Sequence, residues 1–151
     1  MNAYAELRNR QQKEFNAFPM KYAFNQKQFE RGMKELGLEP TDTDKIYKSF
    51  GGGFYRKTDA PALHEMIDRF DREMQEAIAA DPTGEGFIYE MFRCELDNHE
   101  YNYTRDVTET IECLGFTLEE INADERLLNG LLLATGKKKK KTKEKKDDTR
   151  N

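Results

Sequence analysis

The chain has 151 residues, of which 36% are hydrophobic and 36% are charged, and its formal net charge is −4. This length is enough for one domain with a buried core. No apolar run approaches the roughly 18 to 20 residues of a membrane span, and the start MNAYAELRNRQQ lacks the apolar centre of a secretion signal. We therefore expect a cytoplasmic protein with no membrane association.

The charge is distributed unevenly along the chain. Residues 137–151 hold 9 basic and 3 acidic residues and no apolar side chain, so nothing in this stretch can offset the entropy cost of ordering it. We expect an acidic helical domain over residues 1–136 and a disordered lysine-rich tail over residues 137–151. Within the domain, residues 59–125 carry 19 acidic and 4 basic residues, a net charge of −15.

Two helices are expected in the first part of the chain. Apolar residues recur at helical spacing over residues 2–16. A second helix is marked by Asn25, which can cap its start, and by Gly37, which can end it in a left-handed conformation. Phe24 stands where it can pack onto Phe29 across the cap as a hydrophobic staple.

Residues 45–58 have two interpretations. Aromatic and branched residues flank Gly51, Gly52 and Gly53, which predicts two short strands joined by a glycine turn. An ordered loop is the alternative. The triplet lacks the Lys-Ser/Thr of a P-loop and the GxGxxG spacing of a dinucleotide-binding turn, so we expect no nucleotide or other cofactor.

The second half of the chain reads as helical. Residues 58–81 carry an apolar stripe at almost ideal helical spacing. Residues 84–98 predict a central helix whose apolar face is too wide for one neighbour, packed antiparallel to the preceding helix. A helix capped by Thr104 follows, then a capping box at Thr117-Leu118-Glu119-Glu120 and a last helix ending at Gly136.

These elements predict a mainly α fold, a single compact helical domain of five or six helices with a short β-ribbon at residues 45–58. Cys94 and Cys113 lie on expected core faces and are expected to be reduced, buried thiols. The expected core consists of Phe29, Met33, Leu63, Ile67, Phe70, Met74, Phe87, Ile88, Met91, Phe92, Ile111, Leu114, Ile121 and Leu128.

No pattern in the sequence is typical of a catalytic site, so we do not expect an enzyme and assign no catalytic or metal-binding residue. The one exception to weigh is His99, which stands four residues after Glu95. A Glu–His pair can bind a metal ion, but no second histidine stands at ligand spacing, and a histidine hydrogen-bonded to a carboxylate is the simpler interpretation. A metal-dependent enzyme around Glu95 and His99 is the less favoured alternative.

Two resemblances bear on function. The segment CLGFTLEEI, residues 113–121, resembles the Leu-Gly-Phe-Ser-Leu-Glu-Glu-Ile stretch of MerR-type transcription regulators, but its surroundings are acidic where a DNA-reading helix needs basic or amide side chains. Four longer stretches resemble an uncharacterised family of small accessory proteins of bacterial phages and conjugative mobile elements: FPMKYAFNQKQFERGMKELGL, GGGFYRKTDAP, GEGFIYEMF and ELDNHEYNYTRDVTETIECLGFTLEEI. This resemblance implies a bacterial host cell and an accessory role, of which anti-defence proteins such as anti-CRISPR inhibitors are one class.

We therefore expect a non-enzymatic binding protein that presents an acidic surface to the basic nucleic-acid channel of a host defence nuclease, in its most concrete form a CRISPR nuclease. A merely solvated acidic surface is the alternative. Weak, sequence-independent nucleic-acid binding through the lysine tail is a further alternative, and it would weaken as salt rises. The partner-binding residues expected on the acidic surface are Asp68, Asp71, Glu76, Glu90, Glu95, Asp97, Asp106 and Glu109.

Overall fold

The structure is a computed structural model, and it describes residues 2–136. These residues form eight α-helices, three short 3-10 turns and one three-stranded sheet, so the prediction of a mainly α fold is confirmed. The predicted disordered tail, residues 137–151, lies outside the described residues. No helix within residues 2–136 is both long and apolar enough to span a membrane.

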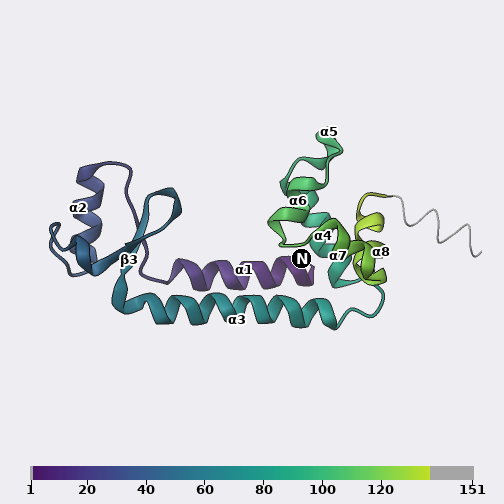
Figure 1. Ribbon diagram of the computed structural model, residues 1–151, viewed down its shortest axis with the longest axis horizontal. Helices are drawn as coiled ribbons and strands as arrows, with labels where there is room; N and C mark the ends of the chain where they lie inside the picture. The colour runs from purple at the N-terminus through teal and green to yellow at the C-terminus, as the bar shows by residue number, and fades with distance from the viewer. Residues whose placement is uncertain (1, 137–151) are drawn as a thin grey trace, which may run out of the picture. The chain divides into compact units, whose positions relative to one another are not determined.

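The described chain divides into two compact units. Unit 1 consists of residues 2–9 and 74–136, and unit 2 consists of residues 10–73. The division falls inside two helices, α1 (Ala3–Asn16) and α3 (Ala60–Ala79), each of which contributes residues to both units (Figure 1).

Unit 2 contains the sheet. β3 (Gly53–Arg56) lies in its centre and pairs antiparallel with β1 (Lys21–Tyr22) and β2 (Ile46–Lys48). β2 and β3 are the expected ribbon, and Gly51 (φ 67°) and Gly52 (φ 80°) in their connection adopt the left-handed backbone that favours glycine. β1 was not predicted, because two residues are too few to show an alternating pattern. The 3-10 turns are Thr43–Lys45, Phe50–Gly52 and Lys57–Asp59.

Two small cores hold unit 2 together. Helix α2 (Gln26–Glu35) covers one face of the sheet, where Met33 packs with the buried Phe54 of β3 (Figure 1). The second core joins Tyr55, on the other face, to Leu63 of α3. Ile67 was expected in this core, but its side chain is 48% exposed because α3 turns Leu63 and Met66 inward instead.

The start of α2 confirms the predicted cap. The Asn25 Oδ1 atom accepts the Gln28 N–H at 2.8 Å, and the Gln28 side chain accepts the Phe24 N–H at 2.7 Å. The predicted staple is wrong: Phe24 is 80% exposed, and Phe29 packs against Phe54 with ring centroids 4.9 Å apart. The sheet, which the sequence did not place beside this helix, offers Phe29 a larger apolar partner.

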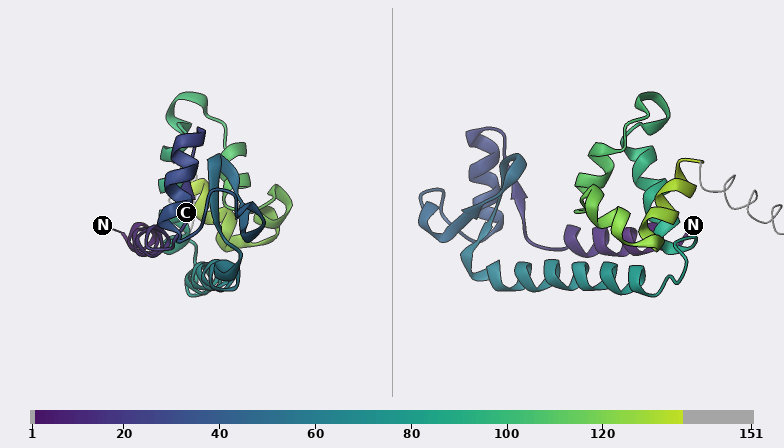
Figure 2. Two further views of the ribbon diagram at one scale, coloured as in Figure 1. Left: turned by 90° about the vertical axis from the view of Figure 1, so that its left-hand side faces the viewer. Right: turned by 45° about the vertical axis from the view of Figure 1, so that its right-hand side comes forward.

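Unit 1 is a group of helices around α4 (Phe87–Asn98), whose Ile88, Met91, Phe92 and Leu96 are fully buried. Of the helices in this unit, α4 packs most extensively against α8, and this corrects the expected antiparallel pairing with α3. The short helices between α4 and α8 in the chain complete this group (Figure 2). The bounds are α5 (Tyr101–Thr104), α6 (Thr108–Cys113), α7 (Leu118–Ala123) and α8 (Glu125–Ala134).

The close approach of α4 and α8 depends on Gly130. A Cβ atom at this position would lie 2.5 Å from Ile88 Cγ2 and 2.7 Å from the Gly84 carbonyl oxygen. Both distances are far below van der Waals contact, so any larger residue would push the two helices apart.

The connection between α3 and α4 is organised by one carboxylate. Asp81 is 6% exposed, and its two oxygens accept the backbone N–H groups of Thr83, Gly84, Gly86 and Ile88 at 2.9 to 3.2 Å. Arg126 of α8 donates to the carbonyl oxygens of Ile78 and Asp81 at 3.0 and 2.8 Å. The guanidinium therefore donates to carbonyl groups at and just beyond the carboxyl end of α3, where α-helical partners run out.

Two further expectations in unit 1 need correction. The helix expected after Thr104 begins at Thr108, because Arg105 takes a left-handed conformation (φ 58°) that stops α5 from continuing. Both cysteines are free thiols, as predicted, but Cys94 is only partly buried and Cys113 is exposed. The capping box at Thr117 and Glu120 is present as predicted.

Candidate functional site

The eight carboxylates predicted to bind a partner are divided between the two units. Asp68 and Asp71 lie exposed on α3 in unit 2, and Glu76 lies exposed on the part of α3 that belongs to unit 1. The other five belong to unit 1, between α4 and α6.

Two of those five are buried or partly buried. Glu90 is partly buried and accepts the backbone N–H of Tyr4 at 3.3 Å. Glu95 is 9% exposed and accepts the hydroxyl of Tyr4. Glu95 is therefore buried and Glu90 only partly exposed, because α1, which the sequence did not place against α4, contacts both.

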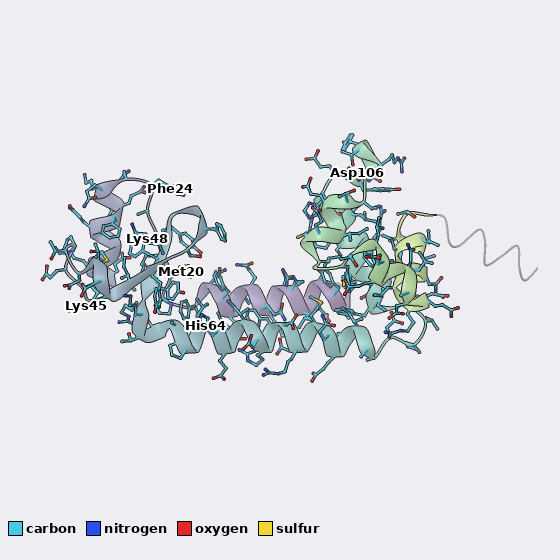
Figure 3. All side chains as sticks on the ribbon, in the orientation of Figure 1. Met20, Phe24, Lys45, Lys48, His64 and Asp106 are labelled. Carbon is cyan, nitrogen blue, oxygen red and sulfur yellow. The ribbon has the colours of Figure 1, made fainter. Side chains whose placement is uncertain are left out.

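The remaining three are exposed but engaged locally. Asp97 forms an ion pair with Arg93 at 3.4 Å, and Glu109 Oε1 lies 3.2 Å from His99 Nδ1. Asp106 accepts the Thr108 N–H at 2.9 Å, and this hydrogen bond lowers the pKa of Asp106. Asp106 lies at the outer end of this region, near α5 (Figure 3).

The negative charge is concentrated in unit 1. Its described residues, 2–9 and 74–136, hold 15 acidic and 4 basic residues, whereas residues 10–73 hold 11 acidic and 12 basic residues. Residues 97–120, called here the acidic segment, contain a single basic residue, Arg105. Their exposed carboxylates are Asp97, Glu100, Asp106, Glu109, Glu112, Glu119 and Glu120.

Glu95, His99 and Cys113 form a cluster in unit 1 that the sequence predicted only in part. One ligand-type atom from each side chain lies within 4.8 Å of the other two. Glu95 and His99 come together because they stand one turn apart at the end of α4. Cys113, the last residue of α6, could not be found from spacing, since it depends on how the intervening chain turns back.

That turn is built from an unusual backbone. Glu100 (φ 59°) and Arg105 (φ 58°) flank α5, and both are non-glycine residues in the left-handed region, where most side chains are strained. Beyond this turn, α6 returns to α4, and the buried Thr110 hydroxyl donates to the Glu95 carbonyl oxygen at 3.3 Å. The end of α6 is therefore held beside the last turn of α4.

The side chains around the cluster fix its orientation. His99 Nδ1 lies 3.2 Å from Glu109 Oε1, and His99 Nε2 lies 4.0 Å from Glu95 Oε1. The other oxygen of Glu95, Oε2, accepts the Tyr4 hydroxyl. Burial, and then the hydrogen bond to Glu95, raise the pKa of Tyr4 far above its usual value, so this hydroxyl remains a donor.

Unit 2 presents a different surface, which the sequence did not reveal. Four large aromatic side chains on or beside the sheet are exposed: Tyr22, Phe24, Tyr47 and Phe50. Next to them is a cavity of about 450 Å³, lined in part by Asn25, Lys48 and Gly52. Phe24 and Lys48 both lie in this part of unit 2 (Figure 3). These aromatic residues could be recognised as outward-facing only once it was known which face of each strand is buried.

Comparison with known proteins gives one finding. A family model described as "Family of unknown function (DUF7659)" matches residues 3–137. Neither the curated proteins nor the solved structures give a match. The matched region includes the described parts of both units from residue 3 onward, and with them the acidic segment and the Glu95–His99–Cys113 cluster. The chain therefore belongs to the DUF7659 family.

Proposed function

We propose that the chain is a non-enzymatic binding protein that presents the acidic segment of unit 1 to a basic, nucleic-acid-handling partner. The observation that carries this proposal is the charge of unit 1, where 15 acidic residues stand against 4 basic ones in residues 2–9 and 74–136. The resulting net charge of −11 is larger in magnitude than the net charge of about 2 to 8 that keeps a small domain soluble.

The acidic segment has carboxylates free to meet cations. Within residues 2–136, Glu100, Glu112 and Glu119 form no ion pair, and all three are exposed. A field of one sign attracts a basic surface over a Debye length and raises the rate of association. A channel lined with arginine and lysine, such as one that holds nucleic acid, is the kind of surface that fits.

The most concrete form of this proposal is an anti-CRISPR-type inhibitor that occupies the nucleic-acid channel of a host defence nuclease. It is supported by the resemblance of residues 15–132 to accessory proteins of phages and conjugative elements, which also supports a bacterial cytoplasm as the setting. The mechanism is competition: the carboxylates replace nucleic-acid phosphates as partners of the channel's cations, with no reaction catalysed.

The test is a triple charge reversal, Glu100→Lys, Glu112→Lys and Glu119→Lys. Its matched control reverses three exposed carboxylates of unit 2, Glu39, Asp44 and Glu65. A guide-loaded Cas9-type nuclease is mixed with each protein, and DNA cleavage and binding are measured in one buffer. We expect the native chain and the control to inhibit, and the unit 1 variant to lose about tenfold or more, since exposed charges act mainly on association and its salt dependence.

Two results would contradict the proposal. Equal inhibition by both variants would show that the acidic segment is not the binding surface. If the native chain inhibits no CRISPR nuclease from a panel that covers the Cas9 and Cas12 types, the anti-CRISPR form of the proposal fails, and the acidic segment is then tested against other basic nucleic-acid-binding enzymes by the same pair of variants.

The exposed aromatic side chains of unit 2 favour a second candidate, binding of single-stranded nucleic acid. Stacking of bases on aromatic rings contributes about 1 to 3 kcal/mol per base and does not depend on the base sequence. Tyr22 and Tyr47 flank the central strand, each opposite a residue of β3. The Lys57 ammonium lies 5.1 Å from the centre of the Tyr47 ring. The lysine tail, outside the described residues, would add phosphate contacts.

Fluorescence anisotropy with a short single-stranded oligonucleotide tests this candidate. We expect Tyr22→Ala with Tyr47→Ala to weaken binding at least tenfold, and removal of residues 137–151 to reduce the salt dependence without abolishing binding. The control is Tyr103→Ala, which removes an exposed aromatic ring from unit 1. If removal of the tail abolishes binding and the two tyrosine substitutions leave binding unchanged, the tail alone binds the oligonucleotide.

A further inference from the structure

The Glu95–His99–Cys113 cluster has the atoms of a metal site, and no hydrogen bond joins Glu95 to His99 within it. Its carboxylate oxygen, imidazole nitrogen and thiol sulfur lie within 4.8 Å of one another. The 4.0 Å between Glu95 Oε1 and His99 Nε2 is too long for a hydrogen bond. Ligands of one tetrahedral zinc ion stand about 3.3 to 3.8 Å apart, given bonds of about 2.0 to 2.3 Å. A movement of about 1 Å closes the difference.

Glu95 and His99 each have a hydrogen-bond partner on the atom that would not bind the metal. Glu109 contacts His99 Nδ1 at 3.2 Å, which leaves Nε2 turned toward Glu95 and Cys113. The Tyr4 hydroxyl donates to Glu95 Oε2. Oε1 lies on the side of His99 and accepts the Asn98 side-chain N–H at 3.3 Å, and its second lone pair remains available to a metal ion. Metal-binding histidines and carboxylates usually have such outer partners, which fix the ring orientation and strengthen the ligand.

We propose that Glu95 Oε1, His99 Nε2 and Cys113 Sγ bind one divalent transition-metal ion, and that zinc is the ion that suits them best. Magnesium and calcium prefer sets of oxygen ligands. A mixed set of oxygen, nitrogen and sulfur suits zinc and its neighbours. Three protein ligands leave the fourth tetrahedral position open for water. The exposed Cys113 can move toward the other two ligands, and Glu95 Oε1 and His99 Nε2 must also approach each other from their separation of 4.0 Å.

The chain carries its own controls for this proposal. It has two cysteines and two histidines. Cys94 and His64 are the members of each pair outside the cluster, and His64 lies on α3 in unit 2 (Figure 3). Cys113→Ser and His99→Gln therefore remove one proposed ligand each, and Cys94→Ser and His64→Gln make the same chemical change elsewhere.

The experiment titrates the reduced, full-length chain with Co²⁺, whose visible absorption reports tetrahedral and thiolate coordination, and then displaces it with Zn²⁺. We expect one ion per chain, a thiolate-to-cobalt band, and loss of that band in Cys113→Ser. His99→Gln should weaken binding at least tenfold, whereas Cys94→Ser and His64→Gln should bind like the native chain. Glu109→Gln, which keeps all three ligands, should weaken binding about 10- to 100-fold through the outer partner.

Circular dichroism of each variant without metal separates loss of a ligand from loss of the fold. If His99→Gln does not fold, Cys113→Ser, which alters an exposed side chain, still decides the question. The proposal is overturned if the native chain shows no thiolate-to-cobalt band at micromolar protein, or if Cys94→Ser or His64→Gln removes the band as completely as Cys113→Ser does.

Discussion

At the scale of single residues, Asp81 has a clear energetic role. Burial alone would raise the pKa of Asp81, but the N–H donors of Ile88, Gly84, Thr83 and Gly86 outweigh it, and the pKa lies below its usual value. A carboxyl group whose pKa is lowered by folding stabilises the folded state above its unfolded pKa, here about 3.9, and this contribution is lost as the pH falls through the folded pKa.

Asp81→Asn should lower the free energy of unfolding by about 2 to 3 kcal/mol at pH 7, because the amide accepts fewer of the four N–H groups and carries no charge. Urea unfolding of the native chain and the variant, measured at steps from pH 7 downward, should show the difference shrinking below about pH 4. Asp71→Asn, at an exposed position of α3, should change stability by less than about 0.5 kcal/mol. A pH-independent difference would refute the ionic explanation.

At the scale of the elements, α4 and α8 are in contact because Gly130 has no side chain. Gly130→Ala should destabilise the chain by about 1 to 3 kcal/mol through overpacking against Ile88, although alanine favours a helix over glycine by about 1 kcal/mol. Urea unfolding shows whether the substitution lowers or raises the free energy of unfolding. The control is the difference between Gln75→Ala and Gln75→Gly, at an exposed position inside α3, since it reports helix propensity without packing. A more stable Gly130→Ala variant would show that α8 shifts freely.

The element scale also shows what the sequence could and could not predict. The caps at Asn25 and Thr117 depend on residues three positions apart, so they were read correctly from the sequence. The packing of α4 against α8 depends on Gly130, which lies far along the chain, and no local sequence pattern predicts this contact. The turn at Glu100 and Arg105 adopts a left-handed backbone without glycine, so the usual signal was missing. For the same reason Glu95 and His99 could be paired from their spacing, but Cys113 could not.

At the scale of the whole molecule, the concentration of negative charge in unit 1 lowers the stability of the fold. Like charges within unit 1 repel one another, and salt screens them: the Debye length falls from about 30 Å at 0.01 M to about 3 Å at 1 M. Raising NaCl over this range should therefore increase the free energy of unfolding by about 1 kcal/mol or more, the size of a few surface ion pairs.

The triple reversal of Glu100, Glu112 and Glu119 provides the comparison, because it changes the net charge of the described part of unit 1 from −11 to −5. Its salt response, followed by urea unfolding at each NaCl concentration, should be smaller than that of the native chain. Equal responses would attribute the salt effect to the hydrophobic contribution, which salt also strengthens.

The division of the chain inside α1 and α3 makes unit 1 discontinuous in sequence, with unit 2 inserted between residues 9 and 74. A fragment that begins at residue 74 would lack Tyr4, whose ring packs edge-on against Phe87 and whose hydroxyl holds Glu95. During synthesis, all residues of unit 2 leave the ribosome before those of α4 do, and domains form in the order in which their chain becomes available. The N-terminal residues of α1 therefore cannot make their contacts with α4 until that helix has emerged.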